Sequence, residues 1–228
     1  MRIVGCVSTW NEGPLIVECV RSLLPACDLV VVYEGPFGQP PEVKGQIPND
    51  LFLDKELKSA YHINRLIVKR GQWESQARKL TEMTHQVARF GAGKEPVWAL
   101  HLDGDEVLLW GQFLRDIVRR FMEELPDERW MNIKLVEMDG TVGGTQTHLI
   151  RADLVESYFV SGSQILFKGD SFPIALYNPD GDRFPIQGEP HILHRSALRS
   201  KGRDAPELRA HKSEEDAWFL RKEREQIG

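Results

Sequence analysis

The first 34 residues carry the pattern that most restricts the fold. Short apolar runs span Arg2 to Val7 and Leu29 to Tyr33, which is typical of strands buried on both faces. Between them, Pro14 to Leu24 has its apolar residues on one stripe, which predicts a helix that starts at a proline and stops before Pro25. A strand, a helix and a strand at this spacing form a βαβ unit, so we expect a parallel sheet.

The alternation continues along the chain. Further strands are predicted over 97–102, 130–136 and 147–150, and another helix is predicted over 113–122. An apolar face from Trp73 to Val87 predicts one more helix, which the glycines around residue 92 end. Residues 35–50 and 161–195 are rich in Gly and Pro and show no clear period. The pattern as a whole predicts an α/β fold.

Composition limits the function class. The net charge of the 228 residues is -5, whereas domains that grip nucleic-acid backbones usually have a basic surplus. The three cysteines, Cys6, Cys19 and Cys27, lie in or beside apolar segments, which favours buried reduced thiols over disulfides or a zinc site. No run approaches the roughly 20 apolar residues of a membrane span, and the start becomes polar too soon for a secretory signal. We therefore expect a cytoplasmic protein with a domain over 1–198 and a charged helical tail or lid over 199–228.

Asp103-Gly104-Asp105-Glu106 is the sharpest chemical feature. It follows the predicted strand over 97–102, and open α/β sheets bind ligands beyond the carboxyl ends of their strands. Two carboxylates separated by a glycine that relaxes the turn can face a hard divalent cation. The alternative is an acidic turn that only ends a strand. A second copy, Asp180-Gly181-Asp182, follows Asn178-Pro179 without an apolar strand, so we interpret it as a structural turn.

Other polar residues follow the same strand-end logic. The loop over 8–14 and Glu34 end the first two strands, where Glu34 could accept from a base or a ribose hydroxyl. Arg78 lies off the apolar stripe of its helix, so it either contacts a diphosphate or simply faces solvent. His191 and His194 lie in one short apolar segment, where three-residue spacing on a strand lets at most one of them serve a given metal.

The order of these motifs resembles that of family 2-like glycosyltransferases of the GT-A fold. The matching segments are Val7 to Glu12, the helix ending in Arg21-Ser22-Leu23-Leu24, the strand ending at Glu34, Gln76-Ala77-Arg78, Leu102 to Glu106, and His194-Arg195-Ser196. The resemblance covers residues 1–110 well and 145–200 loosely.

The resemblance implies a Rossmann-like nucleotide-diphospho-sugar transferase fold, with a mixed, mainly parallel sheet and flanking helices. It implies glycosyl transfer from a nucleoside-diphosphate sugar, first of all a UDP-sugar. It also implies Mn²⁺ or Mg²⁺ bound by Asp103 and Asp105 with His194 as a further ligand. Thr9, Glu12 and Glu34 would line the nucleoside. Asp103 would contact the nucleotide-sugar donor as well as the metal, and Arg78 would face the phosphates or the sugar.

Several points stay open at this level. The segment 34–37 departs from the family pattern, which leaves the donor base open. Inverting members of the family present a late Asp or Glu as catalytic base, and the loosely matching segment 161–164 has none. By elimination we predict Asp170 as the base, and the alternatives are Glu156 or an enzyme that retains configuration. The rival functions are a sugar-nucleotidyltransferase and a non-catalytic nucleotide-sugar-binding protein. The acceptor could be a saccharide, an envelope glycan, a small molecule, a protein or a modified DNA base.

Overall fold

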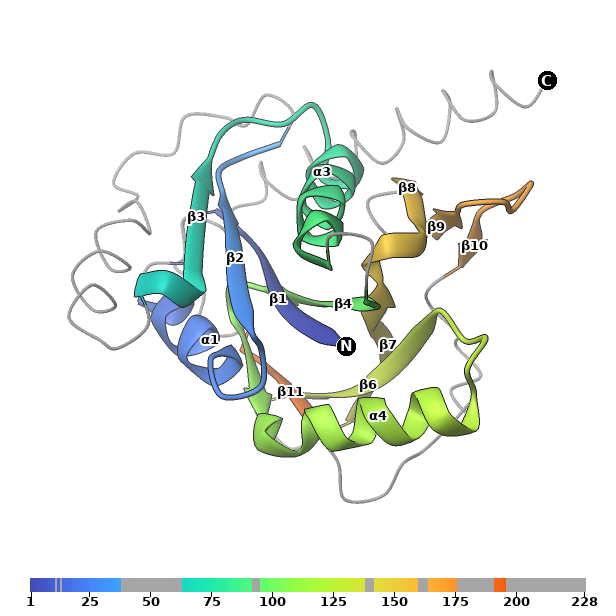
Figure 1. Cartoon of the computed structure of the whole chain (residues 1–228). Helices are drawn as coiled ribbons and strands as arrows, with labels where there is room; N and C mark the ends of the chain where they lie inside the picture. The colour runs from blue at the N-terminus through green and yellow to red at the C-terminus, as the bar shows by residue number, and fades with distance from the viewer. Residues whose placement is uncertain are drawn as a thin grey trace.

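The computed structural model describes residues 1–10, 12, 14–37, 63–91, 95–137, 142–159, 164–175 and 191–195. Figure 1 shows their arrangement, a large sheet with helices on both of its faces. The helices are α1 (Leu15–Leu23), α3 (Gln76–Ala88) and α4 (Leu114–Glu124), with short 3-10 turns at Ile63–Arg65, Arg89–Gly91, Gly111–Phe113 and Ala152–Leu154. The strands are β1 (Arg2–Thr9), β2 (Leu29–Glu34), β3 (Leu66–Arg70), β4 (Val97–Asp103), β5 (Glu106–Leu109), β6 (Trp130–Glu137), β7 (Val142–Arg151), β8 (Val155–Phe159), β9 (Gln164–Phe167), β10 (Ile174–Ala175) and β11 (His191–His194).

The main sheet has eight strands in the order β3-β2-β1-β4-β7-β6-β11-β5. Its first four strands are mutually parallel, and β7 runs antiparallel between β4 and β6. Beyond β7, β11 is parallel to β6 and β5 is antiparallel to β11. The pairing of Val4 with Leu29 through Thr9 with Glu34 confirms the predicted βαβ unit.

Helices cover the sheet on both faces, as the strand pattern requires. α1 and α4 pack on one face, around a core that includes Val7, Leu23 and Trp98. α3 packs on the other face, around Tyr33 and Met83, and a second sheet of order β10-β9-β8 lies beside it. The predicted fold class, a mixed and mainly parallel sheet with flanking helices, is therefore confirmed.

Three features differ from the expected elements. β3 was not predicted, since its apolar run ends in Lys69 and Arg70, which are exposed at the sheet edge. The acidic turn leads into the short strand β5 rather than directly into a helix. β8 and β9 were not predicted either: β9 lies in the stretch 161–195 and has only four residues, too few to establish a period, and β8 follows directly after the predicted strand over 147–150.

Some of the remaining sequence predictions can be compared with the structure, and others fall outside the residues that it describes. The three cysteines are buried and unbridged, as predicted. No helix in the described ranges is long and apolar enough to span a membrane. The charged tail over 199–228 and the second acidic turn at 180–182 lie outside the described residues.

Candidate functional site

The carboxyl ends of four parallel strands meet at one edge of the main sheet. Thr9, Glu34 and Arg70 are successive Cα partners across β1, β2 and β3, and Ser8 pairs with Asp103 on β4. Thr9 and Glu34 are buried, and Asp103 is half-buried. Ligands of open α/β sheets bind at such an edge, and the fold brings Thr9, Glu34 and Asp103 together there.

The acidic turn between β4 and β5 is held through its backbone. The Gly104 N–H donates to the Ser8 carbonyl at 3.2 Å, and the Asp103 N–H donates to Oε2 of Glu106 at 2.7 Å. The Asp105 carbonyl accepts from Nε of Arg195 at 3.1 Å. Each residue of the Asp-Gly-Asp motif is therefore fixed by a neighbour, so the turn is ordered before any ligand arrives.

Gly104 is required by close approach. A Cβ at this position would lie 2.4 Å from Oγ1 of Thr9 and 2.5 Å from Cγ of Glu12. Among the described residues, positive φ glycines occur at Gly35 and Gly169 and not here. The sequence analysis expected a glycine here because it relaxes the turn, whereas in the structure the glycine is needed because any side chain would clash with Thr9 and Glu12. The same contact places Glu12, which is buried, directly against the acidic turn.

The short strand β11 brings one of the two predicted histidines to this edge. The Cα of His194 pairs with Glu106 on β5 and with Glu137 on β6, whereas His191 pairs with Leu109 at the far end of β5. The backbone of His194 therefore lies beside the acidic turn. Its role as a metal ligand stays a prediction. Glu137 is a strand-end carboxylate that the sequence analysis missed, although it follows the predicted strand directly.

The side chains of the acidic turn are of the type that binds a hard divalent cation. Carboxylate oxygens suit Mg²⁺ and Mn²⁺, and Asp105 is fully buried beside the half-buried Asp103. The described side chains include no group of three or more His, Cys, Asp or Glu arranged to hold a metal. Mg²⁺ is commonly held by one or two carboxylates together with substrate phosphates. Asp103 and Asp105 therefore fit an ion whose remaining ligands come from a diphosphate.

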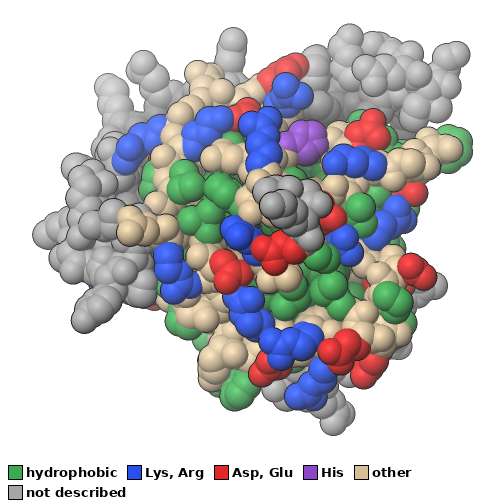
Figure 2. Space-filling model, viewed as in Figure 1, with side chains coloured by type: hydrophobic (Ala, Val, Ile, Leu, Met, Phe, Trp, Pro, Cys, Tyr) green, Lys and Arg blue, Asp and Glu red, His purple; other side chains and the backbone are tan. Residues whose placement is uncertain are grey.

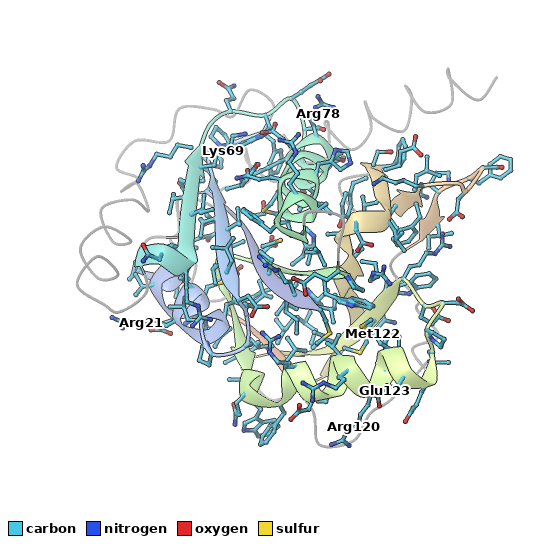
Figure 3. The ribbon with its side chains drawn as sticks, viewed as in Figure 1. Arg21, Lys69, Arg78, Arg120, Met122 and Glu123 are labelled. Atoms are coloured by element: carbon cyan, nitrogen blue, oxygen red, sulfur yellow. The ribbon has the colours of Figure 1, made fainter. Side chains whose placement is uncertain are left out.

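Two neighbouring cations of α3 have opposite environments. Arg78 is exposed, and Figure 3 shows it at the end of α3 where the chain enters from β3. Lys79 is only 1% exposed, and its Nζ donates to the carbonyls of Thr9 at 3.0 Å and Gly35 at 2.8 Å. The sequence analysis selected Arg78 and missed Lys79. The available signal was the spacing of Lys79 and the fully buried Met83, four residues apart on one helical face.

Asp170 lies at the opposite edge of the sheet. Its Oδ2 accepts from Nη1 of Arg129 at 2.8 Å, and the Arg129 carbonyl accepts from the Arg151 N–H at 2.8 Å. Arg151 pairs with Trp98 near the start of β4. At about 3.3 Å per residue, Trp98 and Asp103 are on the order of 16 Å apart. The structure therefore does not bring Asp170 to the acidic turn, and Glu156, the other candidate base, is exposed on β8.

Comparison with known proteins finds distant similarity of fold. No protein-family model matches the sequence, and no curated protein matches it. The chain is similar to S. aureus TarS, with a TM-score of 0.36 and 18% identity over 60% of this chain and 21% of TarS. For TarS 1–349 the TM-score is 0.35, with 18% identity over 60% of this chain and 35% of that one. The chain thus spans about a fifth and about a third of these two structures.

A further similarity is to 4-diphosphocytidyl-2C-methyl-D-erythritol synthase. Here the TM-score is 0.38, with 15% identity over 67% of this chain and 76% of the synthase. Similarities at this level concern the arrangement of strands and helices. The residues at the carboxyl edge must therefore carry any argument about function.

Proposed function

We propose that this chain transfers a glycosyl group from a nucleoside-diphosphate sugar to a hydroxyl acceptor, with a divalent cation at Asp103 and Asp105. One observation carries the proposal. The acidic turn ends the central parallel strand β4, has its backbone fixed, and lies at the same sheet edge as Thr9 and Glu34. Ligands of open α/β sheets bind beyond this edge, and carboxylates there are the ligand type that a divalent cation prefers.

Different residues of this sheet edge would contact different parts of the nucleotide-sugar donor. Asp103 and Asp105, with His194, would hold Mn²⁺ or Mg²⁺, which neutralises charge that develops on a leaving diphosphate. Thr9 and Glu34, at the ends of β1 and β2, would line the nucleoside. The exposed Arg78 would reach the phosphates or the sugar from outside α3.

The acceptor side is less constrained. Figure 2 shows cationic and anionic side chains interspersed over the face in view. Lys69 pairs with Glu82, and Lys79 is buried, so neither lysine adds an uncompensated positive charge to the surface around α3. A neutral hydroxyl acceptor is therefore the first class to test.

Calorimetric titration of UDP and UDP-sugars, with Mn²⁺ and with EDTA, tests the proposal. We expect Mn²⁺-dependent donor binding in the wild-type chain and its loss in Asp103→Asn and Asp105→Asn. Asp116→Asn, an exposed position on α4, is the matched control and should bind normally. Equal binding in chelator would show that the acidic turn is structural.

The products separate the proposal from its main rival. Slow hydrolysis of the donor without acceptor should release a nucleoside diphosphate and free sugar. A sugar-nucleotidyltransferase would instead consume a nucleoside triphosphate and a sugar phosphate and release pyrophosphate. Donor binding with neither product would indicate a non-catalytic binding protein.

A further inference from the structure

Lys79 is a buried cation on the inner face of α3. A lysine is almost never fully buried unless its charge is paired. It also sits in the first turns of a helix, where the macrodipole disfavours positive charge. Its side chain lies over the ring of Trp73, with Nζ 5.0 Å from the ring centroid. Burial and the helix dipole therefore disfavour this charge, while the face of the Trp73 ring attracts it.

The ammonium joins the ends of the first two strands. Thr9 ends β1 and Gly35 follows β2, and both carbonyls accept from Nζ, at 3.0 and 2.8 Å. The Gly35 N–H also donates to the Thr9 carbonyl at 3.0 Å. The two strand ends and the first turns of α3 thus form one hydrogen-bonded unit.

The backbone conformation of Gly35 makes this contact possible. Its φ is +141°, and an added Cβ would lie 1.8 Å from the Gly71 carbonyl oxygen. No residue but glycine fits this backbone. The glycine turns the chain after Glu34 so that its carbonyl meets the ammonium of Lys79.

The charge environment points to the proposed site. Burial lowers the pKa of Lys79 to about 8, while Glu34 and Asp103 act in the opposite direction. A buried charge of this kind is weak evidence for stability, because an apolar side chain of similar size often serves as well. The two carboxylates that attract the ammonium are both residues of the proposed donor site.

We propose that Lys79 is a positioning residue that holds the ends of β1 and β2 in the arrangement that binds the nucleoside of the donor. The inference rests on the proposed function. It assigns Lys79 no contact with substrate. Its effect passes through the backbone of Thr9 and Gly35, and so through the placement of Glu34.

Titration of uridine, UMP and UDP into wild type, Lys79→Met and Lys79→Gln tests this role. We expect Lys79→Met to weaken all three ligands by a similar factor, on the order of tenfold, because each contains the nucleoside. Glutamine keeps an N–H group that can donate to one of the two carbonyls, so Lys79→Gln should weaken nucleotide binding less than Lys79→Met does. Lys69→Met removes an exposed lysine nearby and should bind like wild type.

Three results would overturn the inference. Unchanged binding by Lys79→Met, with circular dichroism showing a folded chain, would make Lys79 structural only. A loss that grows from uridine to UDP would indicate a direct phosphate contact. A wild-type chain that binds no nucleotide of any base would remove the proposed function itself, which the product assays show independently. If Lys79→Met fails to fold, the Lys79→Gln titration decides between these outcomes.

Discussion

Arg195 shows how one side chain fixes the acidic turn from a distant part of the chain. It is 5% exposed. Its Nε donates to the Asp105 carbonyl at 3.1 Å, its Nη2 donates to the Leu15 carbonyl at 3.1 Å, and its Nη1 pairs with Glu18. The guanidinium fork suits three acceptors on separate segments. Arg195 therefore ties the end of β11 to the acidic turn and to the start of α1.

We predict that Arg195→Met lowers the free energy of unfolding by about 2–4 kcal/mol, because the buried Asp105 carbonyl and the partly buried Leu15 carbonyl both lose their hydrogen-bond donor. It should also weaken Mn²⁺-dependent donor binding, since the turn is no longer held at Asp105. Urea unfolding and calorimetry measure the two effects. Arg119→Met, on the exposed face of α4, should change stability by no more than about 0.5 kcal/mol. Unchanged stability in Arg195→Met would contradict the assigned contacts.

At the scale of elements, a buried polar layer joins α3 to the sheet. Nε2 of His101 on β4 lies 3.2 Å from both Oγ1 of Thr84 and the hydroxyl of Tyr158. Nδ1 of His148 on β7 donates to the His101 carbonyl at 2.8 Å. His101 lies two residues before Asp103 on β4, so this layer supports the end of the strand that carries the acidic turn.

The layer predicts acid sensitivity. Burial and then the neighbouring His148 lower the pKa of His101 to about 3, from an ordinary 6.5. Between these values the unfolded chain binds a proton at residue 101 that the folded chain does not, so stability is complete above pH 6.5 and falls as pH falls. At about pH 5 the loss from this residue is about 2 kcal/mol.

Urea unfolding at about pH 7 and pH 5 compares wild type with His101→Gln. The carboxylates contribute equally to both chains, so the difference between their pH dependences reports His101. We expect the variant to be less stable at pH 7 and to lose less stability on acidification. Identical losses in the two chains would show that His101 protonates in the folded state.

The ends of the strands also suggest a catalytic base. β6 ends at Glu137, whose Cα pairs with His194 at the carboxyl edge, whereas Asp170 lies at the opposite edge. We predict that Glu137→Gln lowers kcat by at least about 100-fold with little change in donor affinity, as expected for loss of a general base. Asp170→Asn should leave turnover near that of wild type. Steady-state kinetics of both variants decides between the two carboxylates, and the reverse ranking would restore Asp170.

At the scale of the whole molecule, the three thiols report on the integrity of the sheet. Cys6, Cys19 and Cys27 are buried, and burial raises the pKa of each, in Cys27 to about 12. The reactive thiolate is therefore scarce in the folded chain. We predict that a disulfide exchange reagent leaves the native chain unmodified and labels all three cysteines in urea. Rapid labelling of one thiol without denaturant would reveal local opening near that residue.

Much of the site follows from local pattern. The apolar runs of β1, β2 and β4 and the stripe of α1 are periodicities within the chain, and parallel strands bring their carboxyl ends to one edge. That reasoning was enough to select the loop over 8–14, Glu34 and Asp103, whereas the choice of Thr9 within the loop came from the family resemblance. Thr9, Glu34 and Asp103 share this edge in the structure.

The remaining decisions belong to the tertiary structure. Lys79 and Arg195 carry charge that local sequence assigns to solvent, and only the carbonyls of distant segments make their burial possible. The antiparallel strand β7 turns the chain back, which puts Asp170 at one edge and Glu137 at the other. The sequence by itself therefore determined which strands end in polar groups. The order of the strands decided which of those groups meet, because strand pairing joins residues far apart in the chain.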